Sequence, residues 1–230
     1  MSELRIGFSG LPSKRQLKKA GTLAFVEVQE TFHQGVRPQT LAKRREELPD
    51  SLGLVIRAHR DLTFSRKDDP AAGLLRDTET VERAWASTLT SARAARAAAV
   101  LLRSPADLTP TQRHRDALNA AGARLAQELP GTFAIWEPRG LWGPEELVEV
   151  AGEAGFIPAF DPLTDEPPVD EGPAFFRLAG PGGLRARYGQ EDLIEILELA
   201  LERESTWIGF DYEGGIADAS KLAGLLVEDE

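Results

Sequence analysis

The sequence predicts an α/β protein, a (β/α)₈ TIM barrel that forms a single domain over residues 1–230. Three observations lead to this prediction. Short apolar runs alternate with helix-like runs, about eight such apolar runs occur, and the 230 residues are close to the barrel's usual length of ~250. An open, doubly wound sheet is the competing fold, but Gly7 and Gly10 lack the spacing of a dinucleotide-binding loop.

The strands are predicted where β-branched, aromatic and aliphatic residues gather in short runs. Parallel strands are buried on both faces, so such runs are apolar throughout rather than alternating. The predicted strands are residues 4–8, 24–29, 52–59, 99–103, 132–136, 157–160, 174–178 and 206–212.

The helices are predicted between the strands from apolar spacing and from residues that favour helix ends. Pro38 suits a first turn, Thr109 or Thr111 supplies an N-cap, and Gly155 suits the residue after a helix. Residues 161–173 are rich in proline, so we expect a loop there in place of the helix between strands six and seven. The predicted helices are residues 13–20, 38–48, 80–98, 109 or 111 to 128, 144–154, 191–204 and 216–227.

The composition excludes several classes of protein. Hydrophobic residues make up 42% and charged residues 28%, as in ordinary folded domains. The absence of cysteine excludes disulfides, thiolate nucleophiles and cysteine-based zinc sites. The chain begins with no signal-peptide pattern, and its longest apolar run, residues 97–102, is far shorter than the ~20 residues of a membrane span. We therefore expect a cytoplasmic protein that does not associate with a membrane.

The net charge of −10 is unevenly distributed along the chain. Residues 1–67 carry 13 basic and 7 acidic side chains, whereas residues 68–230 carry 14 basic and 30 acidic ones. Overall acidity disfavours a surface coated by nucleic acid. The basic side chains of residues 13–20 and 38–48 form either a solvated face or a local patch that steers anions. The charge pattern is therefore compatible with two kinds of partner: a nucleic acid, or a small anionic or phosphate-bearing ligand.

Most predicted strands carry a charged or imidazole side chain at or near their carboxyl end. Alternation along a strand places Glu137 on the face of Ile135, and Arg177 on the face of Phe175. The C-terminal mouth of a TIM barrel is where such enzymes react, so these residues predict a ligand site; structural ion pairs closing the barrel are the alternative. The residues are Glu27, Arg57, His59, Arg103, Glu137, Asp161, Arg177 and Asp211.

At these positions the chain resembles the YecE-like family (domain of unknown function 72). The segment FVEVQETFH, Phe25 to His33, resembles the family motif Val-Glu-x-Asn-x-Thr-Phe-Tyr. EPRGLW, FFRLAG and RYGQEDL resemble later family motifs in the same order, and the resemblance extends over essentially the whole chain. It implies a TIM barrel whose biochemistry is poorly characterised. Matching residues include Glu27, Glu137, Arg139, Trp142, Arg177 and Tyr188.

The strand-end residues also suggest chemistry. Arginines suit a phosphate or carboxylate, because the guanidinium donates two parallel hydrogen bonds. A carboxylate beside them would act as a general base or help hold Mg²⁺ or Mn²⁺. The candidate catalytic residues are Glu27, Glu137, Asp161 and Asp211. The candidate substrate-binding residues are Arg57, His59, Arg139, Trp142, Arg177 and Tyr188, of which Trp142 would either stack on a ligand or cover the barrel's outer layer.

Several functions are compatible with this residue set. We favour a metal-assisted hydrolase, nuclease- or phosphodiesterase-like, that acts on an anionic substrate. A non-catalytic binding or scaffold barrel is the alternative, because Gln29, Phe64, Ala179 and Asp211 replace amide or imidazole groups of the family motifs. A glycosidase pair of Glu27 and Glu137, a metal triad of His33, His59 and Glu27, and a sugar isomerase or epimerase stay open. Barrel surface exposed by the missing helix would suit a second copy or another protein.

Overall fold

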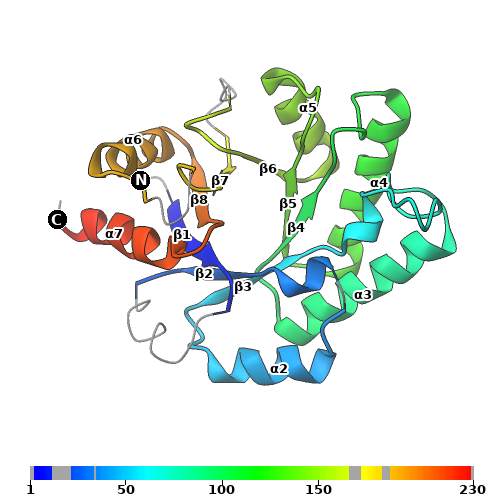
Figure 1. Cartoon of the computed structure of the whole chain (residues 1–230), viewed down its shortest axis with the longest axis horizontal. Coiled ribbons are helices and arrows are strands. Elements are labelled where there is room, and N and C mark those ends of the chain that lie inside the picture. The colour runs from blue at the N-terminus through cyan, green and yellow to red at the C-terminus, as the bar shows by residue number, and fades with distance from the viewer. Residues whose placement is uncertain (1–2, 12–21, 34, 166–171, 183–186, 229–230) are drawn as a thin grey trace. The chain divides into compact units, whose positions relative to one another are not determined.

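The computed structural model describes residues 3–11, 22–33, 35–165, 172–182 and 187–228. Eight parallel strands pair in chain order into a closed barrel (Figure 1). The predicted (β/α)₈ fold is therefore confirmed. The strands are β1 Glu3–Ser9, β2 Phe25–Val28, β3 Gly53–Arg57, β4 Ala99–Arg103, β5 Phe133–Glu137, β6 Ile157–Phe160, β7 Ala174–Leu178 and β8 Ser205–Phe210.

The helices of the described chain begin and end at residues with recognisable capping roles. Thr78 and Thr111 accept backbone N–H groups of the first turns of α3 and α4. Gly155 follows α5 with a φ of +71°, a conformation that glycine adopts without strain. No helix in the described part of the chain is long and apolar enough to span a bilayer. The helices are α2 Pro38–Glu47, α3 Glu79–Ala95, α4 Gln112–Glu128, α5 Pro144–Ala154, α6 Gln190–Leu201 and α7 Gly215–Glu228, with short 3₁₀ helices η1 Glu30–Phe32 and η2 Arg60–Leu62.

Two predicted segments fall on parts of the chain outside the described residues. The basic helix predicted over residues 13–20 is one of them. The other is the middle of the proline-rich segment: residues 166–171 are not described, whereas the described residues 161–165 and 172–173 are not helical. The replacement of a helix by this loop stays a prediction.

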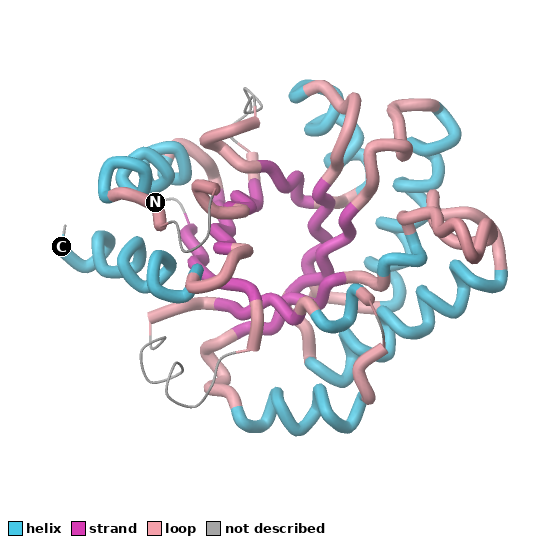
Figure 2. The backbone as a smooth tube through the Cα atoms, viewed as in Figure 1, coloured by secondary structure: helices cyan, strands magenta, loops and turns pink. Residues whose placement is uncertain are grey.

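The chain groups into two compact units, which are described separately. The N/C unit comprises Met1–Glu27, Ser51–Gly53 and Ala159–Glu230; the central unit comprises Val28–Asp50 and Leu54–Pro158. In the N/C unit, α6 and α7 lie together beside β8 (Figure 2). Assignment of all 230 residues to a single domain stays a prediction.

An aromatic layer forms the barrel-side core of the N/C unit. The ring of Phe25 lies 5.8 Å from that of Phe175 and 5.1 Å from that of Trp207, between ring centroids. Glycines make room for these rings: a Cβ on Gly7 would lie 2.6 Å from the Phe25 ring, and one on Gly209 would lie 2.7 Å from the Phe175 ring. Two residues further along these strands, on the same face, the side chains become polar. The aromatic layer therefore packs directly below these polar side chains inside the barrel.

The central unit is built on strands buried on both faces. Leu54, Val55 and Ile56 of β3 are fully buried, as parallel strands covered by helices require. Helices α4 and α5 approach closely at Gly122, where an added Cβ would lie 1.7 Å from the carbonyl oxygen of Ala154. This glycine therefore sets the distance between the two helices.

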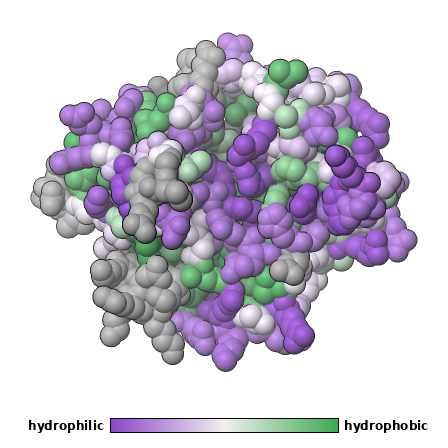
Figure 3. Space-filling model, in the orientation of Figure 1, coloured by the Kyte–Doolittle hydropathy of each residue, from purple (hydrophilic) through white to green (hydrophobic). Residues whose placement is uncertain are grey.

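The outer surface over α3 and α4 is strongly hydrophilic (Figure 3). Arg124 donates two hydrogen bonds, of 2.7 and 2.9 Å, to the carboxylate of Glu82 and lies over the Trp85 ring. Exposed ion pairs of this kind each contribute about 0–1 kcal/mol of stability. Arg124 is thus an arginine of the helical surface whose side chain has a defined carboxylate partner, Glu82.

Candidate functional site

Three of the predicted site residues come together in the N/C unit. Arg177 of β7 donates hydrogen bonds of 2.5 and 3.2 Å to the two carboxylate oxygens of Glu27 of β2. Its Nη2 also donates to Oδ2 of Asp211 at 2.5 Å, directly after β8. Ser9 adds a hydrogen bond of 3.0 Å to Oε2 of Glu27. We call Ser9, Glu27, Arg177 and Asp211 the acidic network.

The acidic network is largely shielded from water. The side chains of Arg177 and Glu27 are 4% and 1% exposed, and that of Asp211 is 15% exposed. Charge-assisted, two-pronged hydrogen bonds between a guanidinium and a carboxylate are among the stronger polar contacts in proteins. Because two carboxylates engage the Arg177 fork, this residue acts here as the partner of Glu27 and Asp211.

Ser9 is a member of the network that sequence reasoning did not single out. It pairs in register with Glu27 across β1 and β2, and it follows Gly7 on the same face. The strand alternation used for the charged residues would therefore have included it.

Two further predicted residues of the N/C unit, Asp161 and Tyr188, lie in half-buried or buried positions. Burial raises the pKa of Asp161, although its Oδ1 accepts the backbone N–H of Leu163 at 3.1 Å. Burial, with a smaller effect of the Asp161 charge, raises the pKa of Tyr188 to about 12. The Tyr188 hydroxyl accepts the backbone N–H of Gly180 at 3.2 Å. At neutral pH Tyr188 is thus a protonated phenol rather than a base.

A buried carboxylate that the sequence did not indicate organises the start of α7. Asp218 is 0% exposed, and its Oδ2 accepts the hydroxyl of Tyr212 and, at 3.1 Å, the backbone N–H of Tyr188. Burial and then Asp218 raise the pKa of Tyr212. Lys221 lies 3.6 Å from the other carboxylate oxygen of Asp218. Asp218 therefore ties the segments after β7 and β8 to the first turns of α7.

The variant Tyr212→Phe is expected to lower the free energy of unfolding by about 1–2 kcal/mol, because buried Asp218 loses a hydroxyl donor. Urea denaturation of both proteins measures the difference. Tyr188→Phe is the matched control and should have the smaller effect, because its hydroxyl accepts one backbone N–H and touches no carboxylate in the described contacts. Equal stability of Tyr212→Phe and the parent chain would contradict this role of Asp218.

The central unit holds a second group of strand-end charges, arranged around Phe32. The guanidinium carbons of Arg57, at the end of β3, and Arg103, at the end of β4, each lie 5.7 Å from the centre of the Phe32 ring. Phe64 packs edge-on against the same ring at 5.3 Å. The Thr31 hydroxyl donates to the carbonyl of Arg57 at 2.6 Å, which anchors η1 to the end of β3.

Glu137 connects this group to a third arginine. Arg103 pairs in register with Glu137, and its Nε lies 2.6 Å from Oε2 of that carboxylate. Nη2 of Arg139 lies 3.7 Å from Oε1, and the Arg139 side chain is 60% exposed. The guanidiniums of Arg103 and Arg139 therefore approach the buried carboxylate of Glu137, and Arg57 shares the Phe32 ring with Arg103. We call Arg57, Phe32, Arg103, Glu137 and Arg139 the arginine cluster.

Trp142 has a structural position in the central unit. Its Nε1 donates to the carbonyl of Leu108 at 2.7 Å, and its ring meets that of Trp136 edge-on at 4.9 Å. Trp136 is fully buried and donates to Ser104 at 3.0 Å. These contacts indicate that Trp142 covers the outer layer of the barrel and favour this role over stacking on a ligand.

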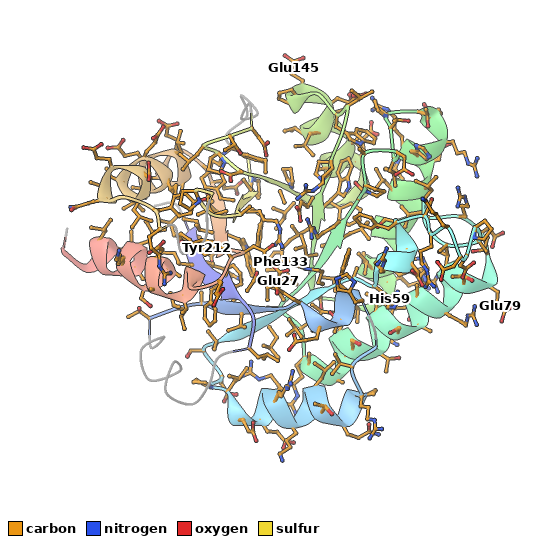
Figure 4. All side chains as sticks on the ribbon, in the orientation of Figure 1. Glu27, His59, Glu79, Phe133, Glu145 and Tyr212 are labelled. Atoms are coloured by element: carbon orange, nitrogen blue, oxygen red, sulfur yellow. The ribbon has the colours of Figure 1, made fainter. Side chains whose placement is uncertain are left out.

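His59 follows β3, and its Nδ1 accepts the backbone N–H of Asp61 at 3.2 Å. Figure 4 shows His59 nearer the centre of the view than Glu79, where α3 begins. Among the described residues, no three histidine or carboxylate side chains gather as metal ligands would. Glu27 and Glu137, the predicted glycosidase pair, belong to different units.

Sequence comparison places these residues in a known family. The model for the protein family of unknown function DUF72 matches residues 8–222, which is most of the chain. The chain belongs to the DUF72 family. The resemblance seen in the strand-end motifs of this DUF72 protein is thereby confirmed. No curated protein sequence matches it.

Solved structures support the fold of this DUF72 protein. A DUF72 protein from Enterococcus faecalis V583 is 12% identical with a TM-score of 0.68, covering 99% of this chain and 98% of its own. A xylose isomerase domain-containing protein from Salmonella typhimurium LT2 is 15% identical with a TM-score of 0.65, covering 97% and 96%. Endonuclease IV from Thermus thermophilus is 14% identical with a TM-score of 0.56, covering 99% and 100%. At such low identity these similarities establish a shared barrel fold.

Proposed function

We propose that this DUF72 protein binds a phosphate-bearing or similar anionic ligand at the arginine cluster and hydrolyses it. The observation that carries the proposal is the grouping of three arginines at neighbouring strand ends: Arg103 and Arg139 approach the carboxylate of Glu137, and Arg57 shares the Phe32 ring with Arg103. Arginines gathered at strand ends favour an anion, because guanidinium forks match the oxygens of phosphate.

The cluster occupies the part of a TIM barrel where catalysis usually takes place. All three arginines lie at or just beyond the carboxyl ends of β3, β4 and β5. Arg57 is buried and Arg139 is exposed, so the cluster extends from the barrel wall to solvent. An anion approaching from solvent would meet Arg139 first.

Glu137 would supply the base for hydrolysis. In this reaction a water oxygen attacks the phosphorus, Glu137 accepts the proton of that water, and the phosphorus–oxygen ester bond breaks. The leaving alkoxide then takes up a proton, so that an alcohol and a phosphate are released. The fold similarity to an endonuclease, an enzyme that cleaves phosphodiesters, is compatible with this chemistry.

A non-catalytic binding barrel is the second candidate function. The acidic network favours it, because Arg177 is engaged by Glu27 and Asp211 within the barrel wall. Ala179 and Asp211 also stand where family motifs carry imidazole and amide groups. In this alternative the arginine cluster still binds an anion, but no bond is broken.

Isothermal titration with inorganic phosphate tests ligand binding. We expect Arg57→Gln and Arg103→Gln each to weaken binding by about 10- to 100-fold, because a hydrogen bond to a charged group contributes about 1.5–3 kcal/mol. Arg124→Gln removes an arginine of the same unit outside the cluster and should bind like the parent chain. If all three variants lost phosphate affinity equally, the loss would reflect the protein's overall charge and would contradict the proposed site.

A phosphoester hydrolysis assay separates the two candidate functions. With bis(p-nitrophenyl) phosphate, in the presence and absence of Mn²⁺ or Mg²⁺, the hydrolase predicts turnover that Glu137→Gln abolishes. Phosphate binding without turnover of this or related esters would instead favour the non-catalytic barrel.

A further inference from the structure

The ring orientation of His59 is set by contacts from two elements. His59 caps η2, and its Nδ1 accepts the backbone N–H of Asp61 at 3.2 Å. Its own backbone N–H donates to the hydroxyl of Thr88 at 3.0 Å, and that hydroxyl donates to the carbonyl of Ala84 within α3 at 2.9 Å. Both the backbone and the imidazole of His59 are therefore held in place.

This arrangement determines which ring nitrogen carries the proton. A backbone amide is a donor under all ordinary conditions, so Nδ1 of His59 must present its lone pair to Asp61. A neutral imidazole has one proton, which then resides on Nε2. The Nε2–H group is a donor, and neither nitrogen offers a lone pair to a metal ion. The sequence hypothesis that His59 ligates a metal with His33 and Glu27 is therefore not supported by this geometry.

Burial favours the neutral form of the His59 ring. Burial lowers the pKa of His59, and Arg60, Arg66 and His33 lower it further, whereas Asp61 raises it. The Asp61 carboxylate lies 4.0 Å from Nδ1 and accepts a hydrogen bond of 3.2 Å from Arg66. Because the Asp61 carboxylate also pairs with Arg66, it stabilises a protonated His59 less strongly. Burial therefore has the largest effect on the pKa of His59.

His59 lies next to the arginine cluster. It follows Arg57 by two residues, and the backbone N–H of Ala58 between them still donates to the carbonyl of Leu101 in β4 at 2.9 Å, so strand alternation places the Arg57 and His59 side chains on the same side. The ring of Phe32, which contacts Arg57 and Arg103, also contacts the ring of His33 at 4.9 Å. His33 is in turn close enough for its charge to act on His59.

We propose that His59 serves the arginine cluster as a neutral hydrogen-bond donor of fixed direction, whose Nε2–H binds an oxygen of the ligand. This rests on the proposed function, and it narrows the ligand: the atom at His59 must be an acceptor, such as a phosphoryl or carboxylate oxygen. It also assigns proton abstraction to Glu137, because a ring with its proton on Nε2 and its Nδ1 engaged is no base.

Nuclear magnetic resonance of protein carrying ¹⁵N-labelled histidine tests the tautomer without a ligand. The chain has three histidines, so His59→Gln assigns the signals of His59 by difference. We expect an unprotonated Nδ1, a protonated Nε2, and a pKa below the ordinary value of 6.5. A ring protonated on Nδ1, or an imidazolium at pH 7.5, would overturn the inference whatever the ligand proves to be.

Addition of inorganic phosphate to the same sample tests the contact. We expect the Nε2 signal of His59 to shift while the tautomer stays unchanged. Loss of one neutral hydrogen bond corresponds to about 1 kcal/mol, so His59→Leu should weaken phosphate binding about fivefold. His59→Gln carries an amide N–H near the position of Nε2 and should retain most of the affinity.

The outcomes separate the two proposals. Phosphate binding that depends on Arg57 and Arg103 but leaves the His59 signals unmoved would overturn the role of His59 and keep the anion site. No phosphate binding by the parent chain would overturn the proposed function, even if the tautomer is as expected. Equal affinity of His59→Leu and His59→Gln would contradict the donor role, and thermal unfolding of both variants checks that they are folded.

Discussion

Arg177→Ala is expected to lower the free energy of unfolding by about 3–5 kcal/mol, the cost of removing one partner from a buried ion pair. The substitution leaves the carboxylate of Glu27, which is 1% exposed, without the guanidinium that donates two hydrogen bonds to it. Asp211 loses the same partner. Urea denaturation of the parent chain and the variant measures the difference.

Arg177→Lys is the matched control for charge. It retains a cation but lacks the planar fork, so we expect a smaller loss than for Arg177→Ala. Combining Arg177→Ala with Glu27→Gln should recover part of the stability, because a neutral amide replaces the stranded carboxylate. A loss below about 1 kcal/mol for Arg177→Ala would show that the acidic network behaves like an exposed pair, contrary to its burial.

Gly122→Ala is expected to destabilise the central unit by about 2–3 kcal/mol, since forced overpacking costs amounts of this order. The added Cβ would lie 1.7 Å from the carbonyl oxygen of Ala154 and 2.9 Å from its carbonyl carbon, and backbone atoms cannot move aside as a flexible side chain can. Helices α4 and α5 would have to separate. Thermal or urea unfolding measures the effect.

Gly152→Ala provides the opposite expectation on the neighbouring helix. Gly152 lies on the exposed side of α5, and a Cβ there would meet nothing within 4 Å. Alanine favours the helix over glycine by about 0.5–1 kcal/mol, so this variant should be more stable than the parent chain. If both glycine variants change stability in the same direction, close packing at Gly122 is not the cause.

Much of the fold was predictable because its strands carry a strong and simple signal. The predicted strands at residues 99–103, 157–160 and 174–178 have the observed bounds, since each is a short, mainly apolar run with a proline within three residues after its carboxyl end. The helix predicted from residue 80 to residue 98 instead spans Glu79–Ala95, because Thr78 caps its start and Arg96 adopts a left-handed conformation. Such end effects depend on local backbone geometry, which apolar spacing does not specify.

The sequence predicted many individual residues of the candidate site, but not which of their side chains would contact one another. Alternation along the strands identified Glu27, Arg177 and Glu137, whose positions depend on strand pairing alone. It did not indicate that Arg177 would be engaged by two carboxylates, because that depends on side-chain conformation. Asp218 was missed because it lies in a helix, and Tyr212 because alternation at the end of the predicted strand 206–212 places it on the face opposite Asp211.

Crystals soaked in tungstate, an anomalously scattering analogue of phosphate, test whether the arginine cluster binds an anion. We expect an anomalous peak at the arginine cluster, in contact with Arg57, Arg103 or Arg139, and a marked loss of that peak in the Arg57→Gln, Arg103→Gln double variant. A strong peak elsewhere on the molecule, or a cluster left empty at tungstate concentrations that label other sites, would contradict it.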